Sequence, residues 1–432
     1  GERVEFSPKI VEKALKSFPK GSAPGGSGCR AQHGLDGLDG LLGDMKEELG
    51  KKMTAVCEIL ANGEAPRGIA KWMAGAPVFP LKKRGGGIRP VAVGEMVRRL
   101  VARLLASDPK IKQKAVDLFR EVRQLGVGIK GGAEIVVQGM RTWLRRKGKR
   151  GWGVLKLDFE NAYNTIDRGK VGEMIQSEFP ELWNWYEYCY GVEGILTCQG
   201  HILPFGSSDG VQQGDPLAPL FFALGILALG KRIKERLKEG IALWYLDDGT
   251  VAGPGEELVA TWTFVQEEAL KVGLKLNVSK CEVWGWHGEE YEWMQKLPPG
   301  IRRICEDGFE LLGAPIGGKK FSEEYAEKRL KNIEETLNEL KNVDDAQAEL
   351  SLLRSCLGYP RFGFTLRSTP PHLIEAAAAK FDALMEKVAG ERFQLRMDED
   401  MKLQWNLPIR FGGIGVPAAS DVSAPAYLGN AL

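Results

Sequence analysis

Hydrophobic and polar positions follow two different periods along this chain of 432 residues. Apolar residues recur every three to four positions around residues 41–60, 95–105 and 171–190, a spacing that predicts helices with one buried face. Shorter apolar runs bounded by turn residues predict strands, and these are GVLKL before Asp158, LKLNV at residues 274–278 and a run from Phe309 to Leu312.

Two segments predict β-hairpins. APVFPLKKRGGGIRPVAVGE contains two short strands around a basic, glycine-rich tip. ALWYLDDGTVAG contains two more, joined across Asp-Asp-Gly, a composition typical of tight turns. A helix is expected from Pro216 to about Lys238, with Asp215 as a structural N-cap, and a further helix from about Glu256 to Val272. The middle third of the chain is therefore predicted to be α+β.

The pattern changes beyond Phe321. Three amphipathic segments rich in alternating charge follow, namely EEYAEKRLKNIEETLNELKNV, AQAELSLLRSCLGYPRFGF and PHLIEAAAAKFDALMEKVAG. Their apolar positions recur at helical spacing, so each is predicted to bury one face against the others. We expect a separate helical subdomain here.

The composition is that of a folded globular protein and argues against a chain that is disordered throughout. Hydrophobic residues make up 44% and charged residues 27%, as in ordinary globular proteins. The net charge of +2 does not indicate a polyanionic partner, because the placement of basic groups matters more than their sum. One local cluster stands out: six of the ten residues from Arg141 to Arg150 are Lys or Arg, with Trp143 among them. This run predicts contact with nucleic-acid phosphates, although a solvated helix face is the alternative.

Further features bear on location and completeness. The longest apolar run, Leu217 to Leu229, is interrupted by Pro219 and Gly225 and is shorter than the roughly 20 residues that span a bilayer, so we expect a buried helix and no membrane partner. The seven cysteines are scattered without a CxxC pair, which indicates an intracellular, reducing location, nucleus or cytoplasm. Because residue 1 is glycine, we expect an excerpt of a longer protein.

Three carboxylates stand where predicted strands end. Asp158 follows one strand, and Asp247 and Asp248 lie in the turn of the second hairpin. Adjacent carboxylates repel one another unless cations neutralise them, so a cluster of this kind predicts hard divalent ions such as Mg²⁺. Two such ions would support an in-line displacement at phosphorus. The alternative is that Asp-Asp-Gly is only a polar surface turn.

A family resemblance favours the first interpretation. The order and approximate spacing of seven segments resemble the motifs of reverse transcriptases, especially those of non-long-terminal-repeat retrotransposons. From the N-terminus these segments are SFPKGSAPGGSGCRAQHG, IRPVAVGEMVRRLVARLL, LKLDFENAYNTIDR, GVQQGDPLAPLFFALG, LWYLDDGTVAG, GLKLNVSKCE and FELLGAPIG. The close match covers Phe18 to Gly317, and a looser one extends to LPIRFGGIGVPAA. Leu246 departs from the FADD that is more usual in this group, and we treat it as a tolerated hydrophobic change.

The resemblance implies an α+β right-hand polymerase. Its fingers and N-terminal extension would occupy residues 1–151, and its palm, built on an antiparallel sheet, residues 152–317 with a finger insertion near 169–205. A helical thumb would follow at 318–390. Residues 391–432 would begin a C-terminal region that continues outside this sequence.

The resemblance also implies roles for individual residues. Asp158, Asp247 and Asp248 match the catalytic metal-binding aspartates, and the backbone carbonyl of Phe159 is an additional expected ligand. The expected nucleotide-binding residues are Arg89, Lys83, Tyr163, Gln213, Gly214 and Lys280. The expected nucleic-acid-binding residues, from the basic run, are Trp143, Arg145, Arg146 and Lys147.

Several of these nucleotide-binding assignments have alternatives. Tyr163 would exclude a 2′-hydroxyl, or it would be a core aromatic residue on the helix after the strand. Gln213 and Gly214 would let the backbone approach the nucleotide, or form a polar helix entrance. Lys83 would bind the nucleotide, or it would be a solvated residue at the hairpin tip. Lys280 would protonate the departing pyrophosphate, or it would be a surface lysine.

The function implied is RNA-directed DNA polymerisation. The expected partners are an RNA template, a DNA primer or target DNA, and deoxynucleoside triphosphates, with two Mg²⁺ ions as cofactors and Mn²⁺ as a substitute. Two rival hypotheses are an RNA-dependent RNA polymerase, against which Tyr163 and the LNVSKCE and FELLG segments argue, and a domesticated RNA-binding protein that has lost synthesis. The intact aspartates argue against the second rival.

Overall fold

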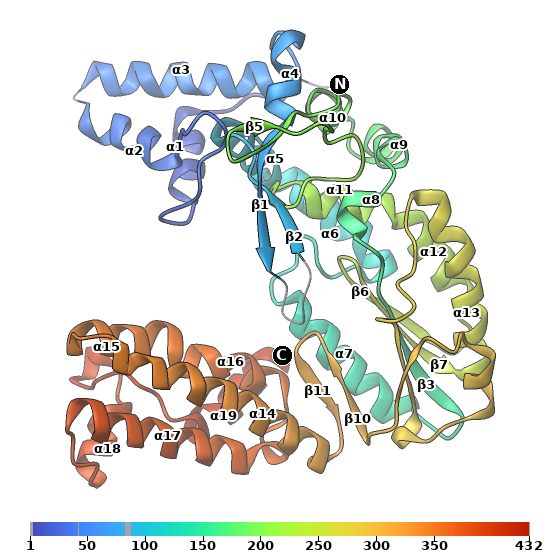
Figure 1. The fold of residues 1–432 in the computed structure, drawn as a ribbon, viewed down its shortest axis with the longest axis vertical. Coiled ribbons are helices and arrows are strands. Elements are labelled where there is room, and N and C mark those ends of the chain that lie inside the picture. The colour runs from blue at the N-terminus through green and yellow to red at the C-terminus, as the bar shows by residue number, and fades with distance from the viewer. Residues whose placement is uncertain (1–2, 42, 83–87, 432) are drawn as a thin grey trace. The chain divides into compact units, whose positions relative to one another are not determined.

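The computed structural model describes residues 3–41, 43–82 and 88–431, and its elements are labelled in Figure 1. The chain forms two compact units, each assembled from separate stretches of sequence. Unit 1 comprises residues 1–129, 157–250 and 260–281, and unit 2 comprises residues 130–156, 251–259 and 282–432.

Unit 1 begins with a mainly helical region and then adds the strands that carry the aspartates. Its helices are α1 (Pro8–Lys16), α2 (Ala31–Gly40), α3 (Asp44–Ala61), α4 (Arg67–Ala74), α5 (Met96–Ser107), α6 (Pro109–Val122), α8 (Ala162–Thr165), α9 (Arg168–Glu178), η1 (Pro180–Leu182), α10 (Trp183–Tyr190), α11 (Ala218–Gly225), α12 (Leu227–Arg236) and η2 (Ala269–Val272). Its strands are β1 (Ala76–Lys82), β2 (Ile88–Ala92), β4 (Leu196–Cys198), β5 (His201–Ile202) and β6 (Ile241–Tyr245).

Unit 2 holds the rest. Its strands are β8 (Glu282–Gly285), β9 (Arg302–Ile304), β10 (Gly308–Leu311) and β11 (Ala314–Gly317), with most of β3 (Trp152–Leu157). Its helices are α7 (Gly132–Lys147), η3 (Trp286–Gly288), η4 (Glu292–Lys296), α14 (Lys319–Asn338), η5 (Glu339–Asn342), α15 (Ala346–Leu352), η6 (Leu353–Leu357), α16 (Tyr359–Ser368), η7 (Pro371–Leu373), α17 (Glu375–Phe393), α18 (Glu399–Asn406), η8 (Ile409–Phe411) and α19 (Ala419–Ala431). Strand β7 (Asp248–Pro254) and helix α13 (Gly255–Glu268) each belong partly to both units.

Three sheets organise the strands. The first has the order β2-β1-β4-β5, in which β1 and β2 form the predicted antiparallel hairpin with Leu81 opposite Arg89. The second has the order β6-β7-β3-β8-β9, in which β3 and β8 pair antiparallel. The third is the antiparallel hairpin β10-β11. The mixture of helices with antiparallel-rich sheets confirms the predicted α+β fold class.

Two predictions of local structure were wrong. The helix expected over residues 216–238 is two helices, α11 and α12, separated at Ile226. Gly225 permits close packing there, because a Cβ at this position would come within 2.4 Å of Ile166 Cδ1. The strand expected at 274–278 is an irregular segment with a single bridge between Leu276 and Phe159, and the next strand, β8, begins at Glu282.

The helices after β11 surround one apolar core within unit 2, and Figure 1 shows α14, α16, α17 and α19 grouped together. Phe362 and Phe381 stack in this core with ring centroids 5.2 Å apart. Trp405, Val416 and Ala419 are buried in the same core. The segment after residue 390 is therefore an integral part of the helical core. Among the described residues, no helix has both the length and the apolar character needed to cross a membrane.

Candidate active site

The β6–β7 hairpin carries Asp247 and Asp248. Strand β6 ends at Tyr245 and β7 begins at Asp248, so Leu246 and Asp247 form the connection. Leu246 adopts a left-handed backbone conformation with φ +57°, as the first residue of a two-residue hairpin loop commonly does, although a bulky side chain disfavours it. Asp247 is half-buried and Asp248 is exposed. The hairpin therefore presents two carboxylates at its tip.

Asp158 follows β3, the neighbour of β7 in the sheet. The irregular segment at residues 274–278 holds the backbone of Asp158, because the Asn277 N–H donates to the Asp158 carbonyl at 2.8 Å. The Asp158 N–H donates to Cys281 Sγ at 3.3 Å. The next residue, Phe159, is buried in the core. Asp158 is thus held by its main chain, and the residue is partly buried, with Oδ1 of its carboxylate shielded from solvent.

Tyr163 lies close to the aspartates of the hairpin. Its ring stacks on Phe222 of α11, with centroids 4.8 Å apart and planes inclined by 9°. Burial raises the pKa of the Tyr163 hydroxyl, and the charges of Asp247 and Asp248 raise it further. Asp247 and Asp248 therefore lie near enough to Tyr163 for their charge to act on its hydroxyl.

The loop with Gln213 and Gly214 is attached to the backbone of Tyr163. The Val211 N–H donates to the Tyr163 carbonyl at 2.6 Å. Gly210 allows this approach, because a Cβ there would lie 2.3 Å from the same carbonyl oxygen. Gly214 has φ +98°, a conformation that favours glycine, and it is exposed beside the half-buried Gln213. The loop thus joins Tyr163 at the candidate site.

A buried ion pair supports this loop from inside. Arg98 Nη2 lies 3.2 Å from Asp215 Oδ2, and both side chains are almost completely buried. The Tyr190 hydroxyl donates to the same carboxylate oxygen at 2.8 Å, and the Leu217 N–H donates to Asp215 Oδ1 at 2.9 Å. Asp215 is therefore structural, as expected, but the prediction that it is the N-cap was wrong: the N-cap of α11 is Leu217, and Asp215 is instead the buried partner of Arg98. The helix that it precedes begins at Ala218, two residues later than predicted.

The remaining nucleotide-binding candidates are Lys280, Arg89 and Lys83. Lys280 is exposed in a turn, where its N–H donates to the Asn277 carbonyl, next to Cys281. Arg89 is placed by its backbone in β2. The predicted roles of the Arg89 side chain and of Lys83 lie outside the described residues.

The basic run belongs to unit 2, at the end of α7. Arg145, Arg146 and Lys147 are exposed in the last turn of that helix. Trp143 stacks on Trp152 with centroids 5.4 Å apart, so one face of its ring is already covered. Arg141, at the start of the run, is instead half-buried, and its Nη2 donates to the carbonyls of two residues in the same unit, Pro315 at 2.6 Å and Ser368 at 3.0 Å.

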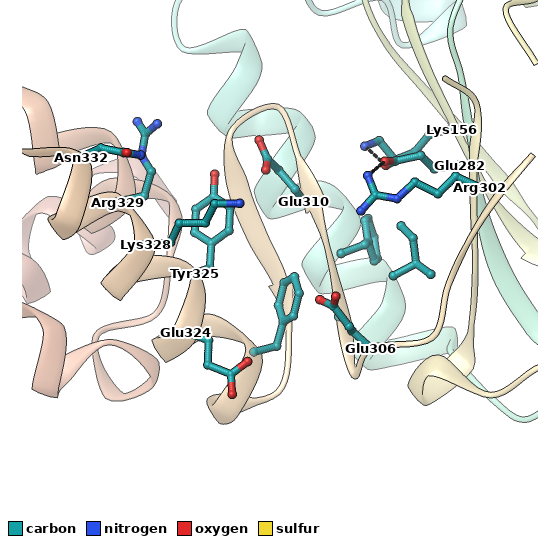
Figure 2. Close-up of a pocket in the computed structure, with 14 residues that line it drawn as sticks. Lys156, Glu282, Arg302, Glu306, Glu310, Glu324, Tyr325, Lys328, Arg329 and Asn332 are labelled. Carbon is teal, nitrogen blue, oxygen red and sulfur yellow. Dashed lines mark hydrogen bonds and ion pairs between the residues drawn. The ribbon is translucent and has the colours of Figure 1, made fainter. Parts of the chain in front are cut away.

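Unit 2 also contains a hollow of about 630 Å³ that no sequence motif indicated. Figure 2 shows its residues, with basic and acidic side chains interspersed. Glu282 on β8 bridges Lys156 on β3 at 2.5 Å and Arg302 on β9 at 2.9 Å (Figure 2). These three residues stand opposite one another in the strand register, so the ion pairs stabilise the sheet.

The donor set at the hairpin suits hard divalent ions, since carboxylate oxygens are their usual protein ligands. In the described part of the chain, no three His, Cys, Asp or Glu side chains are arranged so that they could hold a metal ion. The three aspartates are therefore not gathered into a coordination sphere here. Their role as ligands stays a prediction.

The family follows from comparison with known proteins. Residues 81–316, more than half of the chain, match the family model described as reverse transcriptase (RNA-dependent DNA polymerase). The chain belongs to this family. The resemblance found in the sequence motifs is thereby confirmed, and members of the reverse transcriptase family generally use divalent metal ions.

One curated relative of this reverse transcriptase is the retrotransposable element SLACS 132 kDa protein of Trypanosoma brucei gambiense. The two are 25% identical over 433 residues, which is 97% of this chain and 34% of the relative. The chain thus spans about a third of the length of that protein.

Solved structures of telomerases are also similar. Telomerase from Candida albicans, in complex with the TWJ fragment of telomeric RNA, is 12% identical, with a TM-score of 0.46 over 85% of this chain and 62% of that one. Apo telomerase from Candida tropicalis is 14% identical, with a TM-score of 0.43 over 76% of this chain and 59% of that one.

Proposed function

We propose that this chain is the polymerase part of a retrotransposon reverse transcriptase. It would add deoxynucleotides to a primer 3′-hydroxyl on an RNA or DNA template, in the nucleus or cytoplasm. The observation that carries the proposal is the β6–β7 hairpin, which presents Asp247 and Asp248 at its tip in a chain of this family. The charges of both aspartates also act on the hydroxyl of Tyr163, whose ring is stacked on Phe222.

In the reaction, the primer 3′-oxygen attacks the α-phosphorus of the incoming nucleotide. A new P–O bond forms, the bond to the β-phosphate breaks, and pyrophosphate leaves. Two Mg²⁺ ions, with Mn²⁺ as a substitute, would favour deprotonation of the hydroxyl and stabilise the charge on the leaving group. Asp158, Asp247 and Asp248, with the carbonyl of Phe159, would hold them.

The other residues would orient the nucleotide. The Tyr163 ring, supported by Phe222, would form a wall at the sugar 2′-position. The loop at Gln213 and Gly214, fixed to the Tyr163 main chain, would contact the base and template side. Arg89 and Lys83 would hold the triphosphate, and Lys280 would give a proton to the departing pyrophosphate.

The test is primer extension by the purified protein on an RNA template, with deoxynucleotides and Mg²⁺. Wild-type protein is expected to extend the primer, and Asp247→Ala to lose extension by a factor of about 10³ or more, because a carboxylate that would hold the divalent ions is removed. Asp344→Ala, a change at an exposed aspartate in the helical part of unit 2, is the matched control and should extend normally. RNA binding without extension by folded wild-type protein would favour the domesticated binder instead.

A further inference from the structure

Gln124 contacts the turn that carries the aspartates, although no sequence motif singled it out. It follows the end of α6, where Arg123 has a left-handed conformation with φ +55°. Its side chain is 1% exposed. A buried amide needs hydrogen-bond partners, so its partners show what it is there to hold.

Those partners are the two backbone groups of Leu246. Gln124 Nε2 donates to the Leu246 carbonyl at 2.9 Å, and Gln124 Oε1 accepts from the Leu246 N–H at 2.7 Å. The same Oε1 accepts from the Gly126 N–H at 3.1 Å. With the amide oriented in this way, every contact pairs a donor with an acceptor. The side chain thus binds Leu246 as a neighbouring strand would bind it.

The main chain around Gln124 is itself fixed to the same hairpin. The Trp244 N–H donates to the Arg123 carbonyl at 3.0 Å, and the Leu125 N–H donates to the Trp244 carbonyl at 2.8 Å. The Gln124 amide is therefore presented from a backbone that is already paired with β6. This pairing limits how far the hairpin tip can move relative to Gln124.

Gly126 confines Leu246 further. A Cβ at residue 126 would lie 2.7 Å from the Leu246 backbone nitrogen and 2.7 Å from its Cγ, distances that real Cβ atoms essentially never show. Leu246 therefore lies against a bare glycine backbone. The disfavoured φ of Leu246 is retained because hydrogen bonds and close packing both act on this one residue.

We propose that Gln124 is a positioning residue for nucleotide addition, holding the Leu246 peptide so that Asp247 and Asp248 point correctly. The Leu246 carbonyl belongs to the peptide that leads into Asp247, so fixing both its N–H and its C=O fixes two consecutive peptide planes. Gln124 itself touches no substrate in this assignment. The inference rests on the proposed function, in which the two aspartates hold divalent ions.

The test compares Gln124→Leu with wild type in primer extension. Leucine is similar in size but can neither donate nor accept. We expect kcat to fall by about 10- to 100-fold, the usual effect of misplacing a catalytic group by a fraction of an ångström to an ångström. We also expect the Mg²⁺ concentration for half-maximal rate to rise several-fold, while the Kd for primer–template, measured by anisotropy without Mg²⁺, stays within about twofold. A merely structural residue would not shift the Mg²⁺ response.

Two further variants complete the design. Gly126→Ala presses on the same peptide from another direction, so it should reproduce the shift in Mg²⁺ response and decides the question should Gln124→Leu fail to fold. Gln138→Leu is the matched control. Gln138 also uses its amide twice, binding the Arg367 carbonyl and the Tyr427 hydroxyl, but in unit 2, and its loss should leave kcat and the Mg²⁺ response unchanged.

The outcomes separate the two proposals. If wild-type protein does not extend primers, the proposed function fails. If wild type extends and Asp247→Ala does not, but Gln124→Leu and Gly126→Ala both match wild type in kcat and Mg²⁺ response, the positioning role of Gln124 alone is overturned.

Discussion

The ring of Tyr163 is supported on one face by Phe222, and its side chain remains half-exposed. Support from a buried aromatic neighbour makes the ring a rigid surface, because offset or parallel stacking restricts its rotation. The charges of Asp247 and Asp248 add to the effect of burial in raising the pKa of the Tyr163 hydroxyl. A sugar bound beside those carboxylates would meet the ring and not the solvent.

Replacing Tyr163 with Ala should therefore admit ribonucleotides. We expect the ratio of kcat/KM for ribonucleotide over deoxynucleotide to rise by about 10- to 100-fold, the range for discrimination by steric fit. Steady-state single-nucleotide incorporation measures this ratio. Tyr163→Phe, which keeps the ring and its stacking on Phe222, should retain the discrimination of wild type. An unchanged ratio in Tyr163→Ala would assign this residue to the core.

The buried Arg98–Asp215 ion pair should contribute to the stability of the protein as well as support the loop with Gln213 and Gly214. Arg98→Ala leaves the Asp215 carboxylate buried without its cation, which costs about 3–5 kcal/mol in the free energy of unfolding. Urea denaturation followed by circular dichroism measures this change. Arg67→Ala removes the more exposed Arg67–Glu187 pair and should cost less than about 1 kcal/mol. Equal losses in the two variants would contradict the importance of burial.

At the scale of elements, the sequence correctly predicted those helices and hairpins that depend on local turn composition and apolar spacing. The hairpins β1–β2 and β6–β7 and the helix α5 lie where turn composition and apolar spacing placed them. The strand predicted for LKLNV was wrong because alternation of apolar and polar residues does not supply a neighbouring strand to pair with. The backbone groups of this segment bond to Asp158 and Glu160 and form only one bridge. Periodicity did not reveal the break at Ile226 in the helix predicted over residues 216–238. Gly225, next to that break, packs closely on Ile166, a contact between residues distant in sequence.

The C-terminal turn of α7 offers a test of nucleic-acid contact. Replacing Arg145, Arg146 and Lys147 together with Ala should weaken RNA binding and reduce the slope of log Kd against log salt by about 2 to 3, since each phosphate contact contributes a little under one. Fluorescence anisotropy over a series of KCl concentrations measures the slope. Arg145→Lys with Arg146→Lys retains the charges and should preserve the slope. A slope unchanged by the triple replacement would leave this turn as a solvated face.

At the scale of the whole molecule, the two units are each built from separated stretches of chain, and each has buried residues of its own. The helical core of unit 2 draws on residues from Ala326 to Ala419. The sequence predicted amphipathic helices for much of this range. It could not indicate that Trp405, Val416 and Ala419 complete the core, because such contacts join helices distant in sequence.

Phe381→Ala tests the independence of that core. The substitution should cost about 3–5 kcal/mol, the usual result of removing a buried phenyl ring and leaving a cavity. In hydrogen–deuterium exchange, α14, α16 and α17 should lose protection while α5 and α6 of unit 1 retain theirs. Loss of protection throughout the chain would show that the units unfold together.

In the candidate site, too, the sequence did not reveal contacts between residues that are far apart along the chain. The motifs identified Asp158, Tyr163, Gln213 and the aspartates of the hairpin, because those residues lie in recognisable local patterns. Gln124 was missed: it lies 122 residues before its partner Leu246 and belongs to no motif. The glycines of RQLGVGIKGG are typical of turns, but they do not indicate which residue such a turn contacts.

The bare backbone at Gly126 has a consequence for divergence within the family. Since a Cβ there would collide with the main-chain nitrogen of Leu246 as well as with its side chain, shortening residue 246 to alanine would not release residue 126. We therefore expect relatives that keep this close approach to keep glycine at the position of Gly126, whereas the hydrophobic residue before the two aspartates can vary. An alignment of the family should therefore show an invariant glycine at the position of Gly126, even among members in which the residue before the two aspartates is not leucine.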